Sequence, residues 1–267
     1  MAAKVFTFVN QKGGVGKTTL SVHFGFFLQS YGKRVLFIDN DPQGNGSSRF
    51  EDDGRVGGLR TFHLFSAELP SLSPLKTESG VDLIYSLNGD KDLIDVERLE
   101  IDAVENYVNN VCAIAENYDY IVIDSPPANG WKMTGAVISA DFIYVPVELS
   151  AFATTGVETL LESFYDISTE IGRKIEPTGI IVNRLNTRLK AHIEGLAELR
   201  AEVGHLIMRQ TLGIKGAIDS AVRERKPVWE LKGSGANREA GNEMFQLMEE
   251  IARQCKIKPS ARKGGAK

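Results

Sequence analysis

The sequence has few cysteines, no long apolar run and no excess of basic residues. Its two cysteines, Cys112 and Cys255, cannot build a disulfide framework, and no CxxC pair is present. No apolar stretch approaches the ~20 residues that a membrane-spanning helix needs. Residues 1–10 show no signal-peptide cleavage pattern. These absences argue against secreted, redox and membrane-embedded proteins and predict a cytoplasmic protein in a reducing compartment.

The overall charge argues at first against a protein that binds nucleic acid. The formal net charge is −4, from 31 Lys and Arg against 35 Asp and Glu, whereas nucleic-acid-binding domains usually carry a basic excess. The charge is unevenly distributed, however. Segment 253–267 has six basic residues and no acidic one, and segment 90–105 has seven acidic residues against two basic ones. Such asymmetry indicates oriented surfaces without naming a partner.

Short β-branched and aromatic runs alternate with longer helical segments along the chain. Nearly continuous apolar runs are typical of parallel strands covered on both faces, and the alternation predicts right-handed crossovers. We therefore expect an α/β protein with a doubly wound, mostly parallel sheet and helices on both faces, as a single domain over residues 1–255 with a basic, flexible tail over 256–267. The expected strands are Val5–Asn10, Val35–Asp39, Val81–Ser86, Tyr120–Asp124, Phe142–Val147, Thr178–Asn183 and Leu206–Thr211. The expected helices are Thr18–Ser30, Leu93–Ala115, Thr154–Ile171, Lys190–Val203, Lys215–Arg223 and Ala236–Cys255, with a short one at Arg60–Ser66.

A glycine-rich turn follows the first expected strand, and a Lys-Thr pair then opens a helix. Glycines permit positive φ and close backbone approach, so successive N–H groups can point at one anion, and the helix N-terminus adds a partial positive charge. This order predicts a nucleotide phosphate cradle, in which Lys17 bridges the β- and γ-phosphates and the Thr18 hydroxyl binds Mg²⁺. The alternative is a glycine turn that binds nothing. The expected contacts are Gly13, Gly14, Val15, Gly16, Lys17, Thr18 and Thr19.

The usual GxxxxGK[ST] pattern would have glycine at position 11, where this chain has Gln11 followed by a second lysine, Lys12. The segment NQKGGVGKTT resembles the deviant Walker A box of the ParA/MinD/Soj group of ATPases. The resemblance implies the P-loop NTPase fold and ATP as the ligand. It also implies that Lys12 reaches across a two-fold axis to the nucleotide of a partner subunit. ATP then forms part of a homodimer interface, so its binding stabilises the dimer and its hydrolysis releases it.

Two further expected strands end in aspartates, at the sheet edge where open α/β proteins bind ligands. Residues 39–45 match the family's switch I motif DxDPQGN, which implies that Asp41 orients the attacking water and that Asp39 lies near the Mg²⁺ shell. A capped loop, with aspartates accepting from backbone N–H groups, is the alternative. Asp124 is the Walker B candidate and would hold Mg²⁺ through its water shell, because Mg²⁺ dehydrates reluctantly. Residues 125–130 resemble switch II.

Asn183 ends another expected strand, in the position that reads adenine in relatives. An asparagine at the end of a strand is alternatively a turn residue.

Several relatives do not fit the sequence. The nitrogenase iron protein needs cluster cysteines near switch II, and Mrp-type carriers need a CxxC pair. A MinD-like protein needs a C-terminal amphipathic membrane helix, whereas residues 258–267 have no apolar face, so we expect no membrane partner. Because the first expected strand begins near residue 4, we expect no N-terminal helix-turn-helix. The remaining resemblance is to the short ParA-type partition ATPases.

The family's ATP-bound dimer binds DNA without sequence preference through basic side chains. Between Asn183 and Lys226 there are nine basic residues and five acidic ones, and each phosphate contact makes binding more salt-dependent. Solvated helix faces are the alternative interpretation of these residues. The candidate DNA contacts are Arg188, Lys215, Arg223 and Lys226.

Together these features predict a Mg²⁺-dependent ATP hydrolase, weak and partner-stimulated, whose catalytic residues are Lys12, Lys17 and Asp41. It would associate with the nucleoid and drive plasmid or chromosome partition with a ParB-type partner. One alternative is a ParA-like ATPase that positions a protein cargo, such as a chemoreceptor cluster or a microcompartment. Another is a metabolic P-loop enzyme that transfers phosphate to a small molecule.

Overall fold

One six-stranded sheet forms the centre of the computed structural model, which describes residues 2–50, 57–149 and 153–259. The strand order is β3-β2-β4-β1-β5-β6, and every neighbouring pair is parallel. The strands are β1 (Lys4–Phe8), β2 (Val35–Asp39), β3 (Val81–Ile84), β4 (Tyr120–Asp124), β5 (Phe142–Glu148) and β6 (Gly179–Asn183). The expected α/β fold with a parallel sheet is confirmed.

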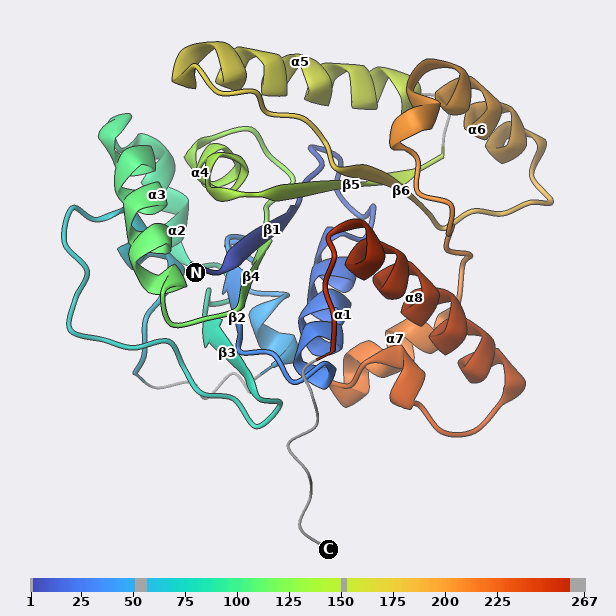
Figure 1. Cartoon of the computed structure of the whole chain (residues 1–267), viewed down its shortest axis with the longest axis horizontal. Coiled ribbons are helices and arrows are strands. Elements are labelled where there is room, and N and C mark those ends of the chain that lie inside the picture. Colours follow the sequence, from blue (N-terminus) through green and yellow to red (C-terminus); the bar gives the residue numbers. More distant parts are fainter. Residues whose placement is uncertain (1, 51–56, 150–152, 260–267) are drawn as a thin grey trace, which may run out of the picture.

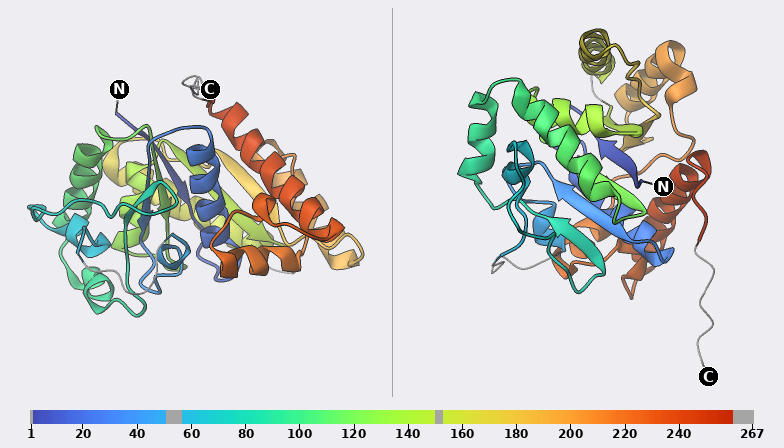
Figure 2. Two further views of the ribbon diagram at one scale, coloured as in Figure 1. Left: turned by 90° about the horizontal axis from the view of Figure 1, so that it is seen from below. Right: turned by 60° about the vertical axis from the view of Figure 1, so that its left-hand side comes forward.

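Helices cover both faces of this sheet, as Figures 1 and 2 show. Phe37 of β2 packs into a cluster with residues of α1, α7 and α8, whereas Leu36 and Ile38 pack with residues of α2 and α3 on the opposite face. Residues of α4, α5 and α6 pack with β5 and β6. Because successive side chains of a strand point to opposite faces, burial on both sides explains the nearly continuous apolar strands. The α-helices are α1 (Lys17–Ser30), α2 (Lys91–Asp95), α3 (Asp102–Ala115), α4 (Trp131–Ser139), α5 (Ala153–Ile171), α6 (Lys190–Val203), α7 (Gly216–Glu224) and α8 (Gly235–Gln254).

The expected strand Leu206–Thr211 is wrong. The chain makes a 3-10 turn at Gly204–Leu206 and then only a single bridge to β6, between Ile207 and Ile180. The backbone N–H groups of Arg209 and Gln210 donate instead to the carboxylate of Glu250 on α8, each at 2.8 Å. A side-chain acceptor has therefore replaced the β-ladder.

The expected helix Leu93–Ala115 is broken into α2, the 3-10 helix η3 (Val96–Arg98) and α3, because Leu99 adopts an extended conformation between them. Helix α4 was not predicted from the sequence. The short helix expected at Arg60–Ser66 forms as a 3-10 helix, η2 (Thr61–Phe65). The other helices agree with the expected ranges to within a residue or so.

None of the described helices is both long and apolar enough to cross a lipid bilayer. At the C-terminal end, Ile257 is buried against the cluster formed with α1 and α8. The rest of the expected tail, residues 260–267, lies outside the described residues. The division into a domain and a tail therefore stays a prediction.

Candidate nucleotide-binding site

The C-terminal ends of three neighbouring strands meet at one edge of the sheet. Asp124, the last residue of β4, is the register partner of Asp39 in β2 and of Phe8 in β1. The glycine-rich loop leaves β1 at this edge, so the sheet topology brings together motifs that lie far apart in the sequence. A cavity of about 450 Å³ opens beside them. Its lining consists of loop residues Gly13, Gly14 and Gly16 to Thr19, of Asp41, Gln43 and Asn45, and of residues of α1 and the α7 region.

Hydrogen bonds and glycine conformations define the shape of the loop. The side chain of Asn10 donates to the Pro146 carbonyl at 2.7 Å and accepts from the Lys12 N–H at 2.8 Å. Gly14 and Gly16 have φ values of 78° and 99°, which L-residues with a side chain rarely adopt. A Cβ at Gly16 would lie 2.3 Å from the Asn183 side chain. The loop therefore requires glycine here for conformation and for space.

The two lysines of the loop have opposite environments. Lys17 is buried, and its Nζ donates to the Lys12 carbonyl at 3.0 Å. Burial lowers the pKa of Lys17, while the carboxylates of Asp124 and Asp41 raise it. Lys12 is exposed on the outer side of the loop. One lysine is therefore directed toward the buried carboxylates, and the other faces outward.

Asp39 is fully buried and well hydrogen-bonded. Its Oδ2 accepts from the Ser47 N–H at 2.6 Å and from the Ser47 hydroxyl at 2.7 Å, and its Oδ1 accepts from the Asp41 N–H at 3.1 Å. Burial raises the pKa of Asp39 to about 6, although the Ser47 hydrogen bonds act in the opposite direction. Asp39 therefore organises the loop that follows β2 and adds negative charge to the site.

Asp124 is equally buried, but neither of its carboxylate oxygens has a well-aligned hydrogen-bond partner. Burial raises the pKa of Asp124 well above its ordinary value, and the charge of Asp39 raises it further. The Thr18 hydroxyl and the Lys17 ammonium group lie close enough to oppose this shift. A buried polar group without a partner requires an explanation.

This arrangement fits a hydrated Mg²⁺ ion, which prefers oxygen ligands and keeps several waters. Asp124 would hold it through water, and Thr18 would supply a hydroxyl oxygen. Among the residues that the structure describes, no group of three or more His, Cys, Asp or Glu side chains could hold a metal ion by itself. Phosphate and water would therefore complete the coordination.

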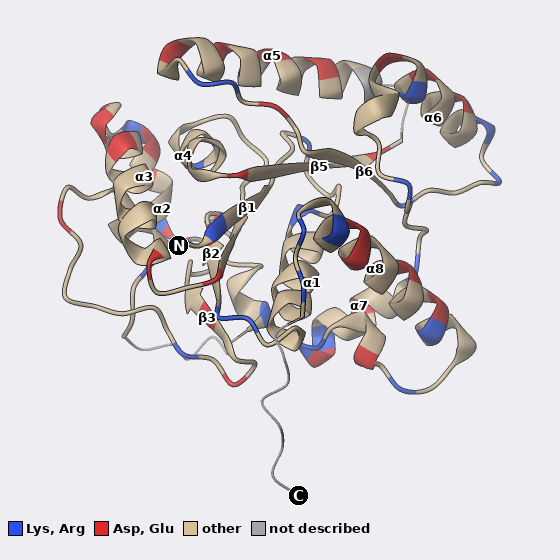
Figure 3. Ribbon diagram, in the orientation of Figure 1, with Lys and Arg blue, Asp and Glu red and all other residues tan. Residues whose placement is uncertain are grey.

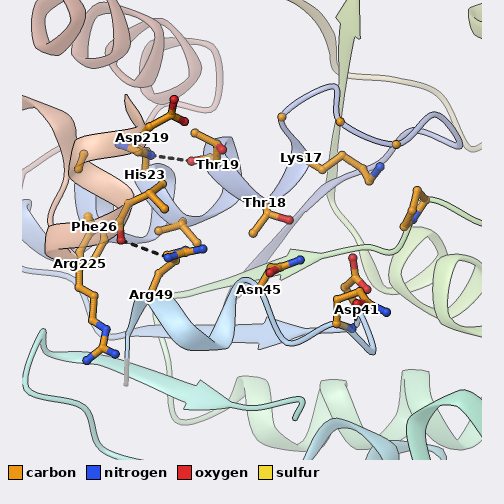
Figure 4. Close-up of a pocket in the computed structure, with 18 of the residues that line it drawn as sticks. Lys17, Thr18, Thr19, His23, Phe26, Asp41, Asn45, Arg49, Asp219 and Arg225 are labelled. Carbon is orange, nitrogen blue, oxygen red and sulfur yellow. Dashed lines mark hydrogen bonds between the residues drawn. The ribbon is translucent and has the colours of Figure 1, made fainter. Parts of the chain in front are cut away.

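Asp41 lies on the loop after β2 and lines the cavity, where Figure 4 shows it on the same side as Lys17. It is 9% exposed, and its Oδ1 accepts from the Gln43 N–H at 2.9 Å. A buried carboxylate at the wall of a phosphate cavity is suited to orient a water molecule by hydrogen bonding.

Both the nitrogen and the oxygen of the Asn183 side-chain amide form hydrogen bonds. Its Nδ2 donates to the Val15 carbonyl at 2.8 Å, and its Oδ1 accepts from the Arg184 N–H at 2.9 Å. In this structure the side chain therefore supports the loop, and its role toward adenine stays a prediction. It also lines a second cavity of about 180 Å³, which is bordered by apolar residues such as Leu212, Ile214 and Met244.

The candidate DNA contacts lie in two regions. Exposed Arg188 is in the loop between β6 and α6, whereas the other three lie in α7 or directly beside it. Lys215 precedes α7 and pairs with Glu239 and Glu243 of α8 at 2.7 and 3.2 Å. These carboxylates compete with any phosphate for its ammonium group. Exposed residues Arg223 and Lys226 lie at the C-terminal end of α7.

Two cavity residues, Arg49 and His23, were not predicted from the sequence. The Arg49 guanidinium donates to the Val222 carbonyl at 3.1 Å and so ties the segment after β2 to α7 (Figure 4). His23 contacts the Thr19 carbonyl through Nδ1 at 2.6 Å and accepts from the Val228 N–H through Nε2 at 3.1 Å. Burial lowers the pKa of His23 to about 4. Their partners lie up to 205 residues away, so no local pattern could have identified them.

Comparisons with known proteins identify the family to which the chain belongs. A family model described as an AAA domain matches residues 3–176. The protein IncC of Escherichia coli is 30% identical over 261 residues, which cover 95% of this chain and 70% of IncC. The chromosome-partitioning ATPase Soj of Treponema pallidum is 31% identical, with 75% of this chain and 79% of Soj covered.

The fold is also similar to that in a solved complex of Cyanothece McdA with ATP. The TM-score is 0.82 with 20% sequence identity, and 98% of this chain and 99% of that chain are covered. The matched family model spans most of the chain, and the chain covers more than two thirds of relatives that are at least 30% identical to it. The chain belongs to the ParA/MinD family of partition ATPases.

Proposed function

We propose that this chain hydrolyses ATP with Mg²⁺, that its ATP-bound form is a homodimer, and that the dimer binds DNA without sequence preference to move a plasmid with a ParB-type partner. One observation carries the proposal. Two lysines of a single phosphate-binding loop have opposite environments, with Lys17 buried beside carboxylates and Lys12 exposed. A loop that served only its own nucleotide would need only the inner lysine.

Within one chain, the loop N–H groups and Lys17 would hold the β- and γ-phosphates, and Thr18 and Asp124 would hold Mg²⁺. Mg²⁺ supplies charge stabilisation to the transferring phosphoryl group. Asp41 would orient the attacking water from the cavity wall. We expect Asp41→Ala to bind ATP and to remain in the ATP-bound, DNA-binding state, because only hydrolysis is blocked.

Between two chains, Lys12 would reach the phosphates of the partner subunit. Its backbone is held on both sides, since its N–H donates to Asn10 and its carbonyl accepts from Lys17. The loop therefore holds the backbone from which the Lys12 side chain extends, so less backbone freedom is lost on contact. We expect Lys12→Gln to bind ATP but not to dimerise or to show stimulated hydrolysis.

Pairing of two chains would also double the basic groups on one face. The net charge of −4 would keep a single chain off DNA, while Arg188, Arg223 and Lys226 from both subunits would bind phosphates cooperatively. Lys215 could bind a DNA phosphate only after its ion pairs with Glu239 and Glu243 have opened.

The test is DNA retardation with ATP, with ADP and without nucleotide, at two salt concentrations and with two unrelated DNA sequences. The proposal predicts binding with ATP alone, equal for both sequences and weaker at high salt. Lys12→Gln is the matched control, because it keeps the phosphate loop and Lys17. Binding without nucleotide, or none with ATP, would contradict the proposal. Binding with ATP would also exclude a metabolic phosphotransferase.

The same ATP-gated cycle could position a protein cargo, since cargo identity depends on the partner. A pull-down with the Asp41→Ala variant and ATP, which holds the dimer, separates the two alternatives. Recovery of a centromere-binding protein supports plasmid partition, whereas recovery of an adaptor of a protein assembly supports cargo positioning.

A further inference from the structure

An asparagine lies between the two aspartates that follow β2 and occupies the variable position of the motif DxDPQGN. This residue, Asn40, is completely buried. Its Nδ2 donates to the Lys132 carbonyl at 3.1 Å and to the Tyr107 hydroxyl at 2.9 Å, and that hydroxyl donates to its Oδ1 at 3.1 Å. Burial of an amide is favourable only when the amide is hydrogen-bonded in this way. The bonds of Asn40 are therefore part of what defines the loop.

The hydroxyl that meets Asn40 is itself held in place by its ring. Tyr107 belongs to α3, is fully buried, and packs on Phe65 with ring centroids 4.7 Å apart. Helices α3 and α4 lie side by side, and a Cβ at Gly135 of α4 would lie 2.7 Å from the Tyr107 ring. In Figure 3 the charged residues of α3 lie near its start, at Asp102 and Glu105, and the remainder of the helix is uncharged. The hydroxyl therefore bonds to a neutral amide from a position that ring packing fixes.

Asn40 also contacts both ends of the segment that follows β4. Its backbone N–H donates to the Asp124 carbonyl at 2.9 Å, which continues the pairing of β2 with β4. Its side chain reaches the carbonyl of Lys132, the second residue of α4. Residues 125–130, which resemble switch II, lie between these two contacts. One buried residue therefore links the loop after β2 to both ends of this segment.

Asp41 directly follows Asn40 and lines the nucleotide cavity. Its N–H donates to Asp39 at 3.1 Å, and its Oδ1 accepts from the Gln43 N–H at 2.9 Å. Both bonds stay within the loop after β2, so they shape the loop without attaching it to neighbouring elements. Asn40 attaches it to β4, α3 and α4. Such attachment matters because a displacement of ~1 Å in a catalytic site can cost about 100-fold in rate.

We infer that Asn40 and Tyr107 are positioning residues for ATP hydrolysis, whose buried hydrogen bonds fix the backbone beside Asp41 and hold it against the start of α4. The inference rests on the proposed ATPase function. Neither Asn40 nor Tyr107 lines the nucleotide cavity. Their loss should therefore lower the rate of hydrolysis and leave the binding of ATP nearly unchanged.

The test of positioning uses Tyr107→Phe, which removes only the hydroxyl. Phosphate release at saturating ATP and Mg²⁺ should slow about tenfold, while the affinity for a fluorescent ATP analogue stays within about twofold. Tyr118→Phe is the matched control, because the buried Tyr118 hydroxyl donates to Asp82 at 2.7 Å just before β4, at the opposite edge of the sheet from Asp124. Wild-type turnover in Tyr107→Phe, or equal losses in both variants, would overturn the inference.

A double-mutant cycle tests the link itself, with urea midpoints measured without nucleotide. Asn40→Ala and Tyr107→Phe remove the same hydrogen bonds, so the second change should shift the midpoint less than half as far in the Asn40→Ala background as alone. Additive shifts would mean that the two side chains are not linked, whatever the rates. If the wild type hydrolyses no ATP, the proposed function fails and the effect on hydrolysis with it, while the midpoints still decide the link. If Asn40→Ala does not fold, Tyr107→Phe with its control decides the positioning.

Discussion

Two regions of the molecule place a buried lysine beside carboxylates, and they differ in how the charges are balanced. At the nucleotide site, Lys17 faces two buried aspartates, Asp41 and Asp124, and neither oxygen of Asp124 has a well-aligned hydrogen-bond partner. At the start of α4, Lys132 pairs with one carboxylate, Glu97, which also accepts backbone N–H groups of that helix. The first region has an excess of negative charge and suits a cationic ligand, whereas the second is neutralised within the protein.

The largest expected effect is on the nucleotide site. Lys17→Ala should weaken ATP binding about 100-fold or more, because charge-assisted hydrogen bonds to phosphate are lost. Titration with a fluorescent ATP analogue measures this. Wild-type affinity in the variant would exclude the assigned phosphate contact.

A change at the neutralised region should affect folding instead. Glu97→Gln leaves the buried Lys132 ammonium group without a counter-charge, and we expect a loss of about 1–2 kcal/mol, reduced because Glu97 is partly exposed. Urea unfolding without nucleotide measures the free energy of unfolding. An unchanged free energy of unfolding would show that the Glu97–Lys132 ion pair does not stabilise the fold. The two regions would then not differ in the way described above.

Asp124→Asn should change the free energy of unfolding, measured in the same way, in the opposite direction. Removing one of two repelling carboxylates should leave the nucleotide-free protein equally stable or about 1 kcal/mol more stable. The additional stability that Mg²⁺ and nucleotide confer on the wild type should disappear. Clear destabilisation without ligand would mean that Asp124 has a structural role.

The smallest expected effect is the dependence of Mg²⁺ affinity on pH. The pKa of Asp39 is raised from 3.8 to about 6, so the protonated form is favoured in the folded state. Its contribution to stability is present below about pH 4 and is lost as pH rises through about 6. Mg²⁺ requires the ionised carboxylates, so its affinity in the presence of nucleotide should rise from pH 5.5 to 7.5. Asp39→Asn should flatten this dependence in a Mg²⁺ titration.

The sequence predicted the sheet and the phosphate loop well because their signals are local. Buried parallel strands are continuous apolar runs, and the glycines with Lys17 and Thr18 form one uninterrupted segment. Asp39 and Asp124 were predicted because each directly follows its own apolar run. The structure added their pairing in register on neighbouring strands.

The failures concern contacts between distant parts of the chain. In the expected strand at 206–211, two backbone N–H groups donate to Glu250 on α8 and do not pair with a strand. The strand propensity of a segment gives no information about such a distant side-chain acceptor. The break between α2 and α3 accompanies the contact of Glu97 with α4, which was itself not predicted. Arg49 acts through a carbonyl of α7 far along the sequence. Such pairs become visible only once the fold brings them together.

The most direct test of the proposed ATP-dependent pairing is sedimentation velocity of Asp41→Ala with Mg²⁺ and ATP, beside the same variant carrying Lys12→Gln. Because hydrolysis is blocked, the nucleotide state stays constant during the run. The account predicts a species of twice the mass of the chain for Asp41→Ala with ATP, and single chains with ADP or with Lys12→Gln added. Single chains in every condition, or dimers that need neither ATP nor Lys12, would contradict it.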